Sequence, residues 1–432
     1  MLKRKMTDYL AHWKETKRSE CLLVRGARQV GKTFIIEDFG RKNYDSFIEI
    51  NFELQPNMKS AFEGDLAVPE MIKNISVRMP NARFVPHKTL VFLDEIQSCP
   101  QARTSLKSWA IDDNYDVVAS GSLLGVNYKA VSSYPVGYER QVDMFSLDFE
   151  EYLWAVGLSQ DLVDSIREHF KGRVKVDDSV NRRMLEYLRE YMVVGGMPHV
   201  VSQFVETRNM GIVHEEQEKI VAAYLNDIAK YADVSDKPKA RSCFLSVPRQ
   251  LAKENTKFQY SAVEPRGTAR KFANALDWLR DAGIIAYCYN LSALQFPLAA
   301  FVKDEQFRIY MTDIGLLVSM YGFEMKAALL DNTLSGPAKG GIYENLMADI
   351  LTKKRLPLYF FKKDDSSVEI EFVLTSEAHP LPVEVKSKTG RTQSLNTVLT
   401  WEGIEEGYKF GMCNVGVDGK KVTMPLYMAM FL

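Results

Sequence analysis

The segment GARQVGKT, residues 26–33, is the feature that most constrains the fold of this chain. It fits the pattern Gly-x-x-x-x-Gly-Lys-Ser/Thr, and it lies between an apolar run, CLLV, and a segment that can form a helix, TFIIEDFG. Glycine at both ends lets the backbone curl so that its N–H groups face a common point. The following helix aims its positive N-terminal end at the same point. This order of strand, loop and helix predicts a phosphate-binding loop.

The loop residues have predicted roles toward a nucleoside triphosphate. Lys32 supplies a cation to the β- and γ-phosphates, and the Thr33 hydroxyl ligates Mg²⁺. The backbone of the loop surrounds the phosphates. The predicted nucleotide-binding residues of this segment are Gly26, Ala27, Arg28, Gln29, Val30, Gly31, Lys32 and Thr33.

A second motif, TLVFLDEIQ at residues 89–97, supplies the carboxylates that such a loop needs. Its apolar residues predict a buried strand that delivers Asp94 at its C-terminal end, where open α/β sheets bind ligands. We expect Asp94 to hold Mg²⁺ through water and Glu95 to act as the general base for the attacking water. An acidic pair at a strand end also fits a solvated turn, but together with the loop upstream it indicates a nucleotide site.

Three further side chains are candidates for this site. The segment DVVASGS, residues 116–122, reads as a buried strand, and Ser120 or Ser122 at its end could contact the γ-phosphate or the water. Arg28 and Arg140 are candidates for stabilising charge on the transferred phosphoryl group. The alternatives are a plain polar strand end for the serines and surface ion pairs for the arginines.

Composition excludes several classes of protein. The net charge is −1, so any contact with nucleic acid must come from a local patch. Five scattered cysteines form no Cys-x-x-Cys pair, which argues against a disulfide framework and a cysteine-rich zinc site. The start of the chain is basic and polar, and no apolar run approaches the length of a membrane span. We expect a cytoplasmic protein with no membrane partner.

The pattern of strands and helices predicts an α/β protein in four parts. Short apolar strands alternate with helices up to residue 146, which implies a parallel sheet. A helical segment, a helix followed by a strand pair, and a return to strands around one helix come next. The predicted domains are the sheet core at 1–146, the helical segment at 147–232, a winged-helix domain at 233–331 and a C-terminal domain at 332–432.

With these motifs identified, the chain resembles the prokaryotic AAA-like P-loop ATPases that carry a C-terminal domain of unknown function. The resemblance runs over nearly the whole chain, and its ordered markers are GARQVGKT, LVFLDEIQ, ASGSLLG, SLDFEEYL, VVGGMP, YMTDIGLL, GGIYENLMADIL and PVEVKS. It implies ATP and Mg²⁺ as cofactors, an ATPase core, a helical segment, a winged helix and a C-terminal α/β domain resembling restriction endonucleases. The family usually has a Gly–Arg pair where this chain has Glu139 before Arg140.

The middle of the chain has a cluster of cations that allows two interpretations. Arg266, Arg270 and Lys271 lie at the start of a predicted helix whose apolar positions recur at helical spacing. In a winged helix that end contacts duplex DNA. The alternative is a packing module with a solvated basic end.

The C-terminal section carries three carboxylates that could share a metal ion. A predicted helix bears Glu344, and two predicted strands bear Glu371 and Glu384, with Lys386 on the same face as Glu384. In a restriction-endonuclease-like core these positions bind Mg²⁺ and orient a water for phosphodiester cleavage. The family usually has Glu-x-Asp where this chain has Glu369 and Glu371, and a degenerate, non-catalytic fold is the alternative.

The leading hypothesis is an ATP-binding and ATP-hydrolysing switch that couples nucleotide state to binding of DNA or of a protein partner. One rival is an ATP-gated, metal-dependent nuclease. The other is a regulator that binds ATP and turns it over negligibly.

Overall fold

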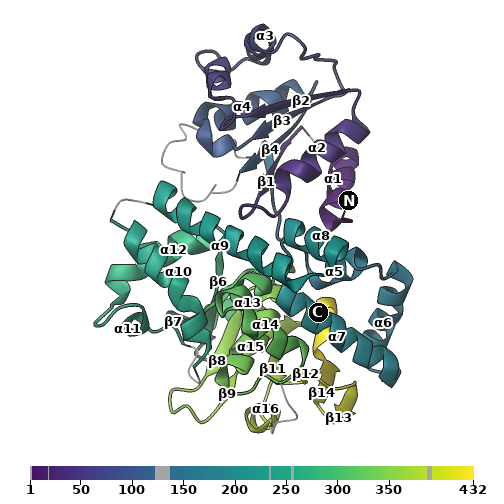
Figure 1. The fold of residues 1–432 in the computed structure, drawn as a ribbon, viewed down its shortest axis with the longest axis vertical. Coiled ribbons are helices and arrows are strands. Elements are labelled where there is room, and N and C mark those ends of the chain that lie inside the picture. Colours follow the sequence, from purple (N-terminus) through teal and green to yellow (C-terminus); the bar gives the residue numbers. More distant parts are fainter. Residues whose placement is uncertain (1, 18, 122–136, 233–234, 254–256, 387–391) are drawn as a thin grey trace. The chain divides into compact units, whose positions relative to one another are not determined.

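The computed structural model describes residues 1–432 except 1, 18, 122–136, 233–234, 254–256 and 387–391. The chain divides into two compact units, an N-terminal unit, Lys3–Ser146, and a C-terminal unit, Leu147–Leu432. Each unit has its own sheets and helices (Figure 1). In the part of the chain that is described, no helix combines the length and apolar character needed to cross a lipid bilayer.

The N-terminal unit is built on a sheet of five parallel strands in the order β2-β3-β4-β1-β5. Its strands are β1 (Cys21–Arg25), β2 (Ser46–Asn51), β3 (Thr89–Asp94), β4 (Asp116–Gly121) and β5 (Glu139–Asp143). Its helices are α1 (Lys5–Thr16), α2 (Lys32–Asn43), η1 (Pro56–Phe62), α3 (Val68–Arg78), η2 (Ile96–Ser98) and α4 (Pro100–Asp112). This is the parallel α/β core typical of P-loop NTPases, as the alternation of strands and helices predicts.

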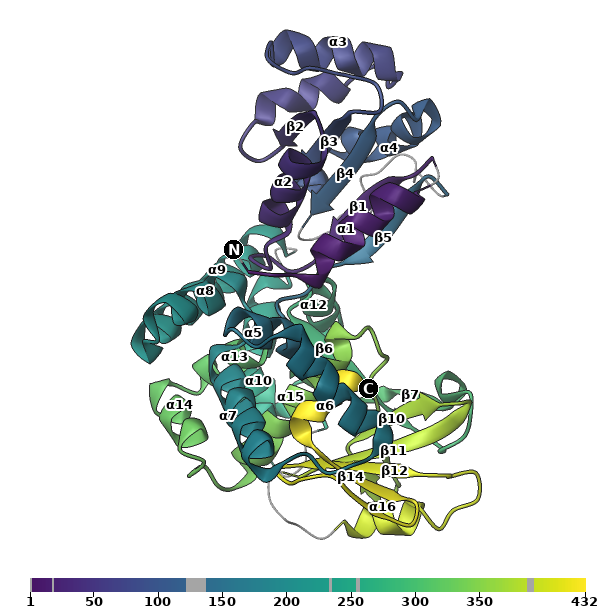
Figure 2. The same ribbon diagram turned by 90° about the vertical axis from the view of Figure 1, so that its right-hand side faces the viewer.

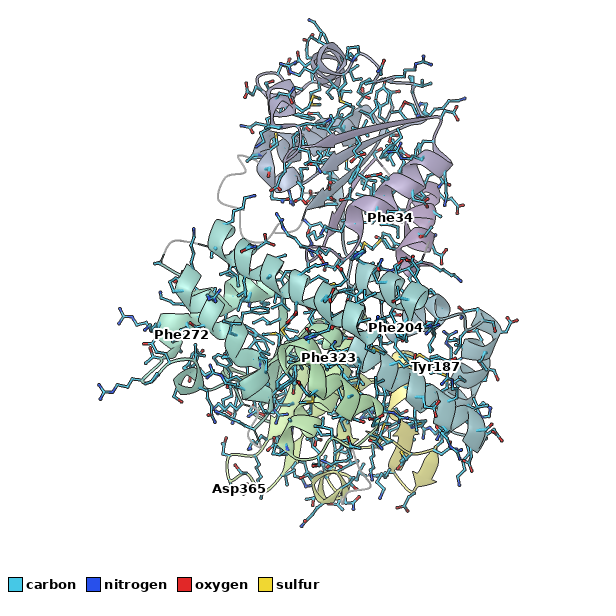
Figure 3. The ribbon with its side chains drawn as sticks, in the orientation of Figure 1. Phe34, Tyr187, Phe204, Phe272, Phe323 and Asp365 are labelled. Atoms are coloured by element: carbon cyan, nitrogen blue, oxygen red, sulfur yellow. The ribbon has the colours of Figure 1, made fainter. Side chains whose placement is uncertain are left out.

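Both faces of this sheet are covered, because successive side chains of a strand point to opposite faces. Leu23, on one face, belongs to a core formed with η1, α3 and α4. On the other face α2 packs so closely that a Cβ on Gly40 would lie 2.3 Å from the Phe47 ring. Phe34 of α2 is 62 % exposed and is marked in Figure 3. The buried sheet thus holds β1 and α2 rigidly at the two ends of the glycine-rich loop.

Helices make up the first half of the C-terminal unit, and two sheets come after them. The helices up to the first strand are α5 (Phe149–Ala155), α6 (Gln160–Gly172), α7 (Asp178–Val194), α8 (Pro198–Thr207), α9 (Met210–Tyr231), α10 (Lys237–Leu251), α11 (Tyr260–Val263) and α12 (Ala269–Asp281). Later helices are η4 (Leu298–Phe301), α13 (Ile314–Met320), α14 (Phe323–Leu330), α15 (Pro337–Lys353), α16 (Gln393–Val398) and η5 (Leu426–Phe431). Tyr187 on α7, Phe204 on α8 and Phe323 on α14 are marked in Figure 3.

The first sheet of this unit joins parts of the chain that the sequence separates. Its order is β7-β6-β8-β9. The strands are β6 (Ile285–Leu291), β7 (Val302–Met311), β8 (Tyr359–Lys362) and β9 (Glu369–Ile370). β6 and β7 are antiparallel, whereas β6 and β8 are parallel. Strands on both sides of residue 332 therefore share one sheet, and the β6–β7 hairpin is structurally joined to the C-terminal hundred residues.

The second sheet has the order β10-β11-β12-β14-β13 and mixes parallel and antiparallel pairs. Its strands are β10 (Phe372–Ser376), β11 (His379–Lys386), β12 (Gly407–Gly411), β13 (Gly416–Asp418) and β14 (Lys421–Pro425) (Figure 2). Helix α15 lies against β11 and β7. It therefore contacts both sheets and carries Glu344 at their junction.

Candidate nucleotide site

The glycine-rich loop turns sharply between β1 and α2. Gly31 has φ 93° and Gln29 has φ 65°, both in the left-handed region that only glycine enters at little cost. A Cβ on Gly26 would lie 2.1 Å from the carbonyl oxygen of Met144, so no side chain fits there. Two glycines thus permit a turn and a close backbone approach that other residues would prevent.

Lys32 is buried at the head of this loop. Its Nζ donates hydrogen bonds to the carbonyl oxygens of Gly26 at 2.9 Å and Ala27 at 2.8 Å. Burial lowers the pKa of Lys32 to about 8, although the nearby Glu95 and Asp94 favour its charged form. Helix α2 starts at Lys32 with no side-chain cap and no acidic residue in its first turn. The positive helix end and the ammonium group are therefore available to an anion.

Asp94 connects the strand ends to the loop. It is 2 % exposed, and its carboxylate accepts hydrogen bonds from the hydroxyl of Thr33 at 3.0 Å, the amide of Asn51 at 2.8 Å and the hydroxyl of Ser120. Parallel pairing brings these groups together, because β2, β3 and β4 end at the same edge of the sheet. The arrangement gathers the hydroxyl and carboxylate oxygens that Mg²⁺ prefers.

Asn51 is a site residue that the sequence motifs do not single out. It ends β2 opposite Asp94 in the register of the sheet. Its side-chain oxygen also accepts hydrogen bonds from the backbone N–H groups of Glu53 and Leu54. The signal that could have found it is a polar residue at the end of an apolar strand, the same signal that identifies Ser120.

Glu95 directly follows β3 and has φ 52°, in the left-handed region. This conformation is uncommon for residues with a side chain and is often found at functional sites. Gln97 donates a hydrogen bond from Nε2 to the Glu95 carboxylate. The side chain of the predicted base is therefore oriented by a neighbour on the same turn.

The two candidate arginines have different positions. Arg28 lies in the loop and forms a long ion pair with Glu53 at 3.8 Å. Arg140 pairs in register with Leu22, at the opposite end of β1 from the loop, and forms an ion pair with Glu20 at 2.5 Å. The structure does not bring Arg140 to the site in its own chain. Ser122 lies outside the described residues.

The segment that follows β5 contacts the loop closely. Arg25, the last residue of β1, pairs with Asp143 through two hydrogen bonds of 2.9 and 3.0 Å, and its carbonyl accepts from the N–H of Met144 at 2.7 Å. Arg4 donates to the carbonyls of Val30 at 3.1 Å and Phe145 at 2.7 Å. Residues 143–145 are thus bonded to Arg25, directly before the loop, and share Arg4 with the loop.

Two residues further along, Leu147 is held within the C-terminal unit. Its N–H donates to the carbonyl of Gly196 at 2.7 Å. Its own carbonyl accepts from the hydroxyl of Tyr191 at 2.9 Å and from Nζ of Lys353 at 3.1 Å. Asp349 bonds to both of these side chains, and burial raises its pKa to about 7. Phe145 is therefore hydrogen-bonded within the N-terminal unit and Leu147 within the C-terminal unit, with one residue between them.

The C-terminal carboxylates are interleaved with cations. Lys386 bonds to Glu371 at 2.7 Å and to Glu384 at 3.0 Å, whereas Glu344 bonds to the buried Arg308 at 3.3 Å. Among the described residues no three His, Cys, Asp or Glu side chains are arranged to hold a metal ion. Glu371 and Glu384 share Lys386, and Glu344 is paired with Arg308. The metal site of Glu344, Glu371 and Glu384 therefore stays a prediction.

One oxygen of each of two carboxylates nevertheless remains without a hydrogen-bond donor. These are Oε2 of Glu371 and Oε2 of Glu384, both buried. Burial and the neighbouring Glu371 raise the pKa of Glu384 to about 7. Burial lowers the pKa of Lys386, but the two carboxylates outweigh it and raise that pKa above its usual value. The pair could therefore receive a further cation.

The predicted DNA-contacting cations lie at or near the start of α12. Arg266 and Arg270 are exposed, and Arg266 has φ 62°. Lys271 forms an ion pair with Glu264 at 2.7 Å, which neutralises part of the cluster.

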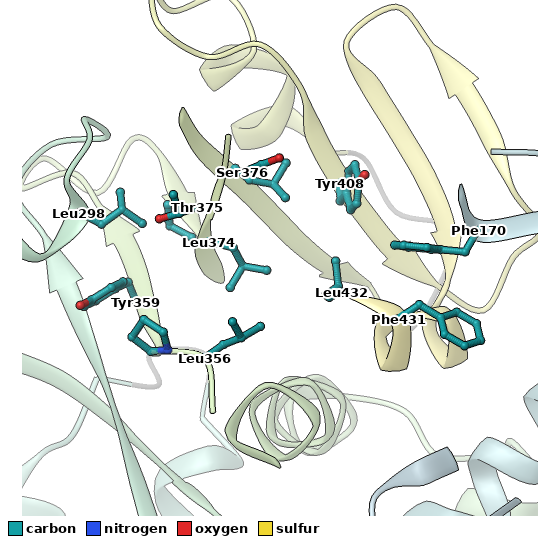
Figure 4. A pocket seen from close by; sticks show the side chains of 13 residues that line it. Phe170, Leu298, Leu356, Tyr359, Leu374, Thr375, Ser376, Tyr408, Phe431 and Leu432 are labelled. Carbon is teal, nitrogen blue, oxygen red and sulfur yellow. The ribbon is translucent and has the colours of Figure 1, made fainter. Parts of the chain in front are cut away.

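An apolar pocket of about 300 Å³ lies in the C-terminal unit. Figure 4 shows side chains of Phe170, Tyr408 and Leu432 among those lining it. Its lining is mostly apolar and has no charged side chain.

Three family models match separate parts of the chain. The model described as AAA domain matches residues 18–153, which include the loop and Asp94. Models described as domains of unknown function, DUF8612 and DUF4143, match residues 185–327 and 339–426. No curated protein matches the chain.

Several solved structures are distantly similar. A Walker-type ATPase of Pyrococcus abyssi is 13% identical, with 74% of this chain and 96% of that chain covered and a TM-score of 0.43. The Orc1 protein of Aeropyrum pernix, solved with DNA, is 13% identical, with 77% and 93% covered and a TM-score of 0.30. The RuvB branch migration motor of Thermotoga maritima is 13% identical, with 66% and 89% covered and a TM-score of 0.31. Similarity this distant does not indicate function.

Proposed function

We propose that this protein, which carries an AAA-like P-loop ATPase domain, hydrolyses ATP with Mg²⁺ and uses the nucleotide state to change the C-terminal unit. The observation that carries the proposal is the 3.0 Å hydrogen bond between Thr33 and Asp94. It joins the loop hydroxyl to the carboxylate of β3, the two oxygen groups that P-loop enzymes use around the metal. Mg²⁺ neutralises charge on the β- and γ-phosphates when it is bound.

The residues of the site divide the remaining work. Lys32 leaves its two loop carbonyls and places its ammonium on the phosphates, while the start of α2 presents its N–H groups. Asn51 and Ser120 hold the Asp94 carboxylate in place. Glu95, oriented by Gln97, accepts the proton of the attacking water. Arg28 is the candidate for stabilising charge on the phosphoryl group, since Arg140 lies at the other end of β1.

The coupling runs through residues 143–147. Arg25, directly before the loop, is bonded to Asp143 and Met144, and Arg4 joins Val30 of the loop to Phe145. A displacement of the loop therefore acts on residues 143–145. Leu147 follows after a single residue and is bonded to Gly196, Tyr191 and Lys353. This closeness along the chain supports a switch in which a shift at the loop changes the start of the C-terminal unit.

The first experiment is a phosphate-release assay on the purified full chain with Mg²⁺, with and without duplex DNA. We expect steady release that Lys32→Ala abolishes, together with loss of ATP binding by calorimetry. Lys42→Ala is the matched control, because Lys42 is an exposed lysine of the same helix that pairs with Asp38. Tight ATP retention by the parent without release would favour the non-enzymatic regulator. Unchanged ATP affinity in Lys32→Ala would remove the site assignment.

A metal site in the C-terminal unit is a second candidate function. The donor-free oxygens of Glu371 and Glu384 support binding of a divalent cation, which a nuclease of the restriction-endonuclease-like kind requires. Lys386 would keep its bonds to Oε1 of both carboxylates, and the cation would bind their Oε2 atoms. Nicking of plasmid DNA in Mn²⁺ tests for the activity.

For the output we favour an interaction with a protein over reading of DNA. Helices α10, α11 and α12 with the β6–β7 hairpin support a winged-helix arrangement (Figure 1). Only Arg266 and Arg270 of the predicted cluster are exposed cations without an ion pair in the described structure, since Lys271 is paired. Because contacts between cations and phosphates supply much of the affinity for duplex DNA, two such cations support only weak binding.

A further inference from the structure

A hollow of about 630 Å³ lies between α12 and the β6–β7 hairpin. Residues of α12 form one wall, and residues of the two strands form the other. Phe272 of α12, marked in Figure 3, is buried and lies 6.4 Å from Tyr260 between ring centroids, while Ala269, Ala273 and Asp277 of the same helix line the hollow. None of the residues assigned above to nucleotide, metal or DNA lines this hollow.

Four aromatic rings form part of its lining. Phe307 lies 4.8 Å from Tyr287, 6.3 Å from Tyr289 and 6.4 Å from Tyr260, measured between ring centroids. The three tyrosines are only partly buried. Aromatic faces carry negative charge density and attract cations. Within the molecule Arg280 already places its guanidinium 5.3 Å from the centroid of the Tyr287 ring.

Carboxylates complete the lining, and no basic residue belongs to it. Asp277 comes from α12 and pairs with Arg280 at 3.0 Å. Asp304 and Glu305 come from β7, are exposed, and form no ion pair in the described part of the chain. The aromatic rings of β6 and β7 and the unpaired carboxylates of β7 thus line the same hollow. Both favour a positive charge there, and both disfavour the phosphates of a nucleic acid.

We propose that this hollow receives the arginine or lysine side chains of a basic segment in a protein partner. The partner's cation lies against the rings beside Arg280, while Asp304 and Glu305 accept hydrogen bonds from its guanidinium or ammonium group.

Binding of a fluorescent hexa-arginine peptide to the full chain, followed by anisotropy without nucleotide, tests the proposal. We expect saturable binding that weakens with added salt. A hexa-glutamate peptide and a short DNA duplex should show no binding that depends on Asp304 and Glu305. The Lys32→Ala variant should bind the hexa-arginine peptide as the parent does. Failure of the proposed ATPase function and failure of this binding proposal can therefore be told apart.

Two variants assign the binding to the hollow. The double change Asp304→Asn and Glu305→Gln should weaken hexa-arginine binding about tenfold. The matched control is Glu324→Gln with Glu402→Gln, which removes the same charge from two exposed glutamates elsewhere in the unit and should change it less than about twofold. Tyr289→Leu should also weaken binding while leaving the charge unchanged. Circular dichroism confirms that each variant is folded. Equal affinity of the parent and the double variant, or equal loss in the control, would overturn the proposal.

Discussion

Asp94 accepts a hydrogen bond from Thr33 at 3.0 Å, although 61 positions separate the two residues. The parallel sheet makes this contact, because β3 ends at the same edge as β1, after which the loop begins. Ser120 and Asn51 reach the same carboxylate from the neighbouring strand ends. The nucleotide site is therefore a product of the strand order as much as of the loop.

The affinity for ATP should depend on pH through Lys32. Burial lowers the pKa of Lys32 to about 8 in the folded chain, so the lysine is charged below that pH and loses its proton above it. Triphosphate binding favours the charged form. We expect the Kd of ATP to be nearly constant below pH 8 and to rise by up to about tenfold for each pH unit above it. Calorimetry across roughly pH 7–10 measures this.

Lys32→Arg is the control for that series, because an arginine keeps its charge over this whole range. Whether or not the ATP affinity of Lys32→Arg equals that of the parent, this affinity should stay constant between about pH 8 and pH 10. A parallel fall in both proteins would assign the effect to another group.

Glu95→Gln should retain ATP and lose hydrolysis. The amide keeps the size of the side chain but cannot accept the proton of water, so we expect the rate of phosphate release to fall about a hundredfold or more. Glu37→Gln changes the same residue type on α2, where Glu37 pairs with Arg41 on the surface, and should hydrolyse ATP at the parent rate. If Glu95→Gln matches the parent, another group is the base.

Asn51→Ala tests a positioning residue that the sequence motifs do not single out. Asn51 donates to Asp94 at 2.8 Å, so its removal frees the carboxylate to rotate. We expect kcat to fall about tenfold with little change in ATP affinity, because the variant loses roughly one hydrogen bond to a charged group. A shift in the Mg²⁺ concentration needed for half-maximal rate should accompany it. A variant that only unfolds more easily would leave that Mg²⁺ dependence unchanged.

The C-terminal carboxylates make a separate prediction about metal ions. Mn²⁺ at millimolar concentration should raise the Tm of the full chain in the Lys32→Ala background, because a ligand that binds only the folded state stabilises it. Glu384→Ala should remove the effect, and Lys386→Ala should mostly preserve it. The full chain is the proper sample, since β6 and β8 pair across residue 332. A melting curve indifferent to Mn²⁺ would make this region a structural or binding platform.

The N-terminal site can be predicted from sequence because its residues belong to local motifs. A glycine spacing, a lysine and a strand followed by an acidic pair define it, and the parallel α/β sheet follows from the alternation of strands and helices. Asn51 escapes such a prediction because a single polar strand end has no distinctive spacing. Its role depends on which strand lies beside β3, and that order is set by the whole sheet.

Prediction is weaker where long-range packing decides the position of a side chain. Arg140 is a candidate by its place in the chain, but the register of β5 against β1 puts it opposite Leu22 and away from the loop. Glu344 is expected beside a metal, which stays a prediction, but its pairing with Arg308 of β7 could not be foreseen from the sequence. No local pattern in the chain indicates that β7 and α15 meet, because that contact depends on the packing of the whole C-terminal unit.

Hydrogen exchange on the Glu95→Gln protein, with and without ATP and Mg²⁺, tests the switch most directly. We predict slower exchange at residues 26–33 on ATP binding, together with changed exchange at 143–149 and at 193–197, where Leu147 is bonded to Gly196. Adding Lys32→Ala should abolish both effects. Protection confined to the loop, with 143–149 and 193–197 unchanged at saturating ATP, would contradict the coupling between the nucleotide site and the C-terminal unit.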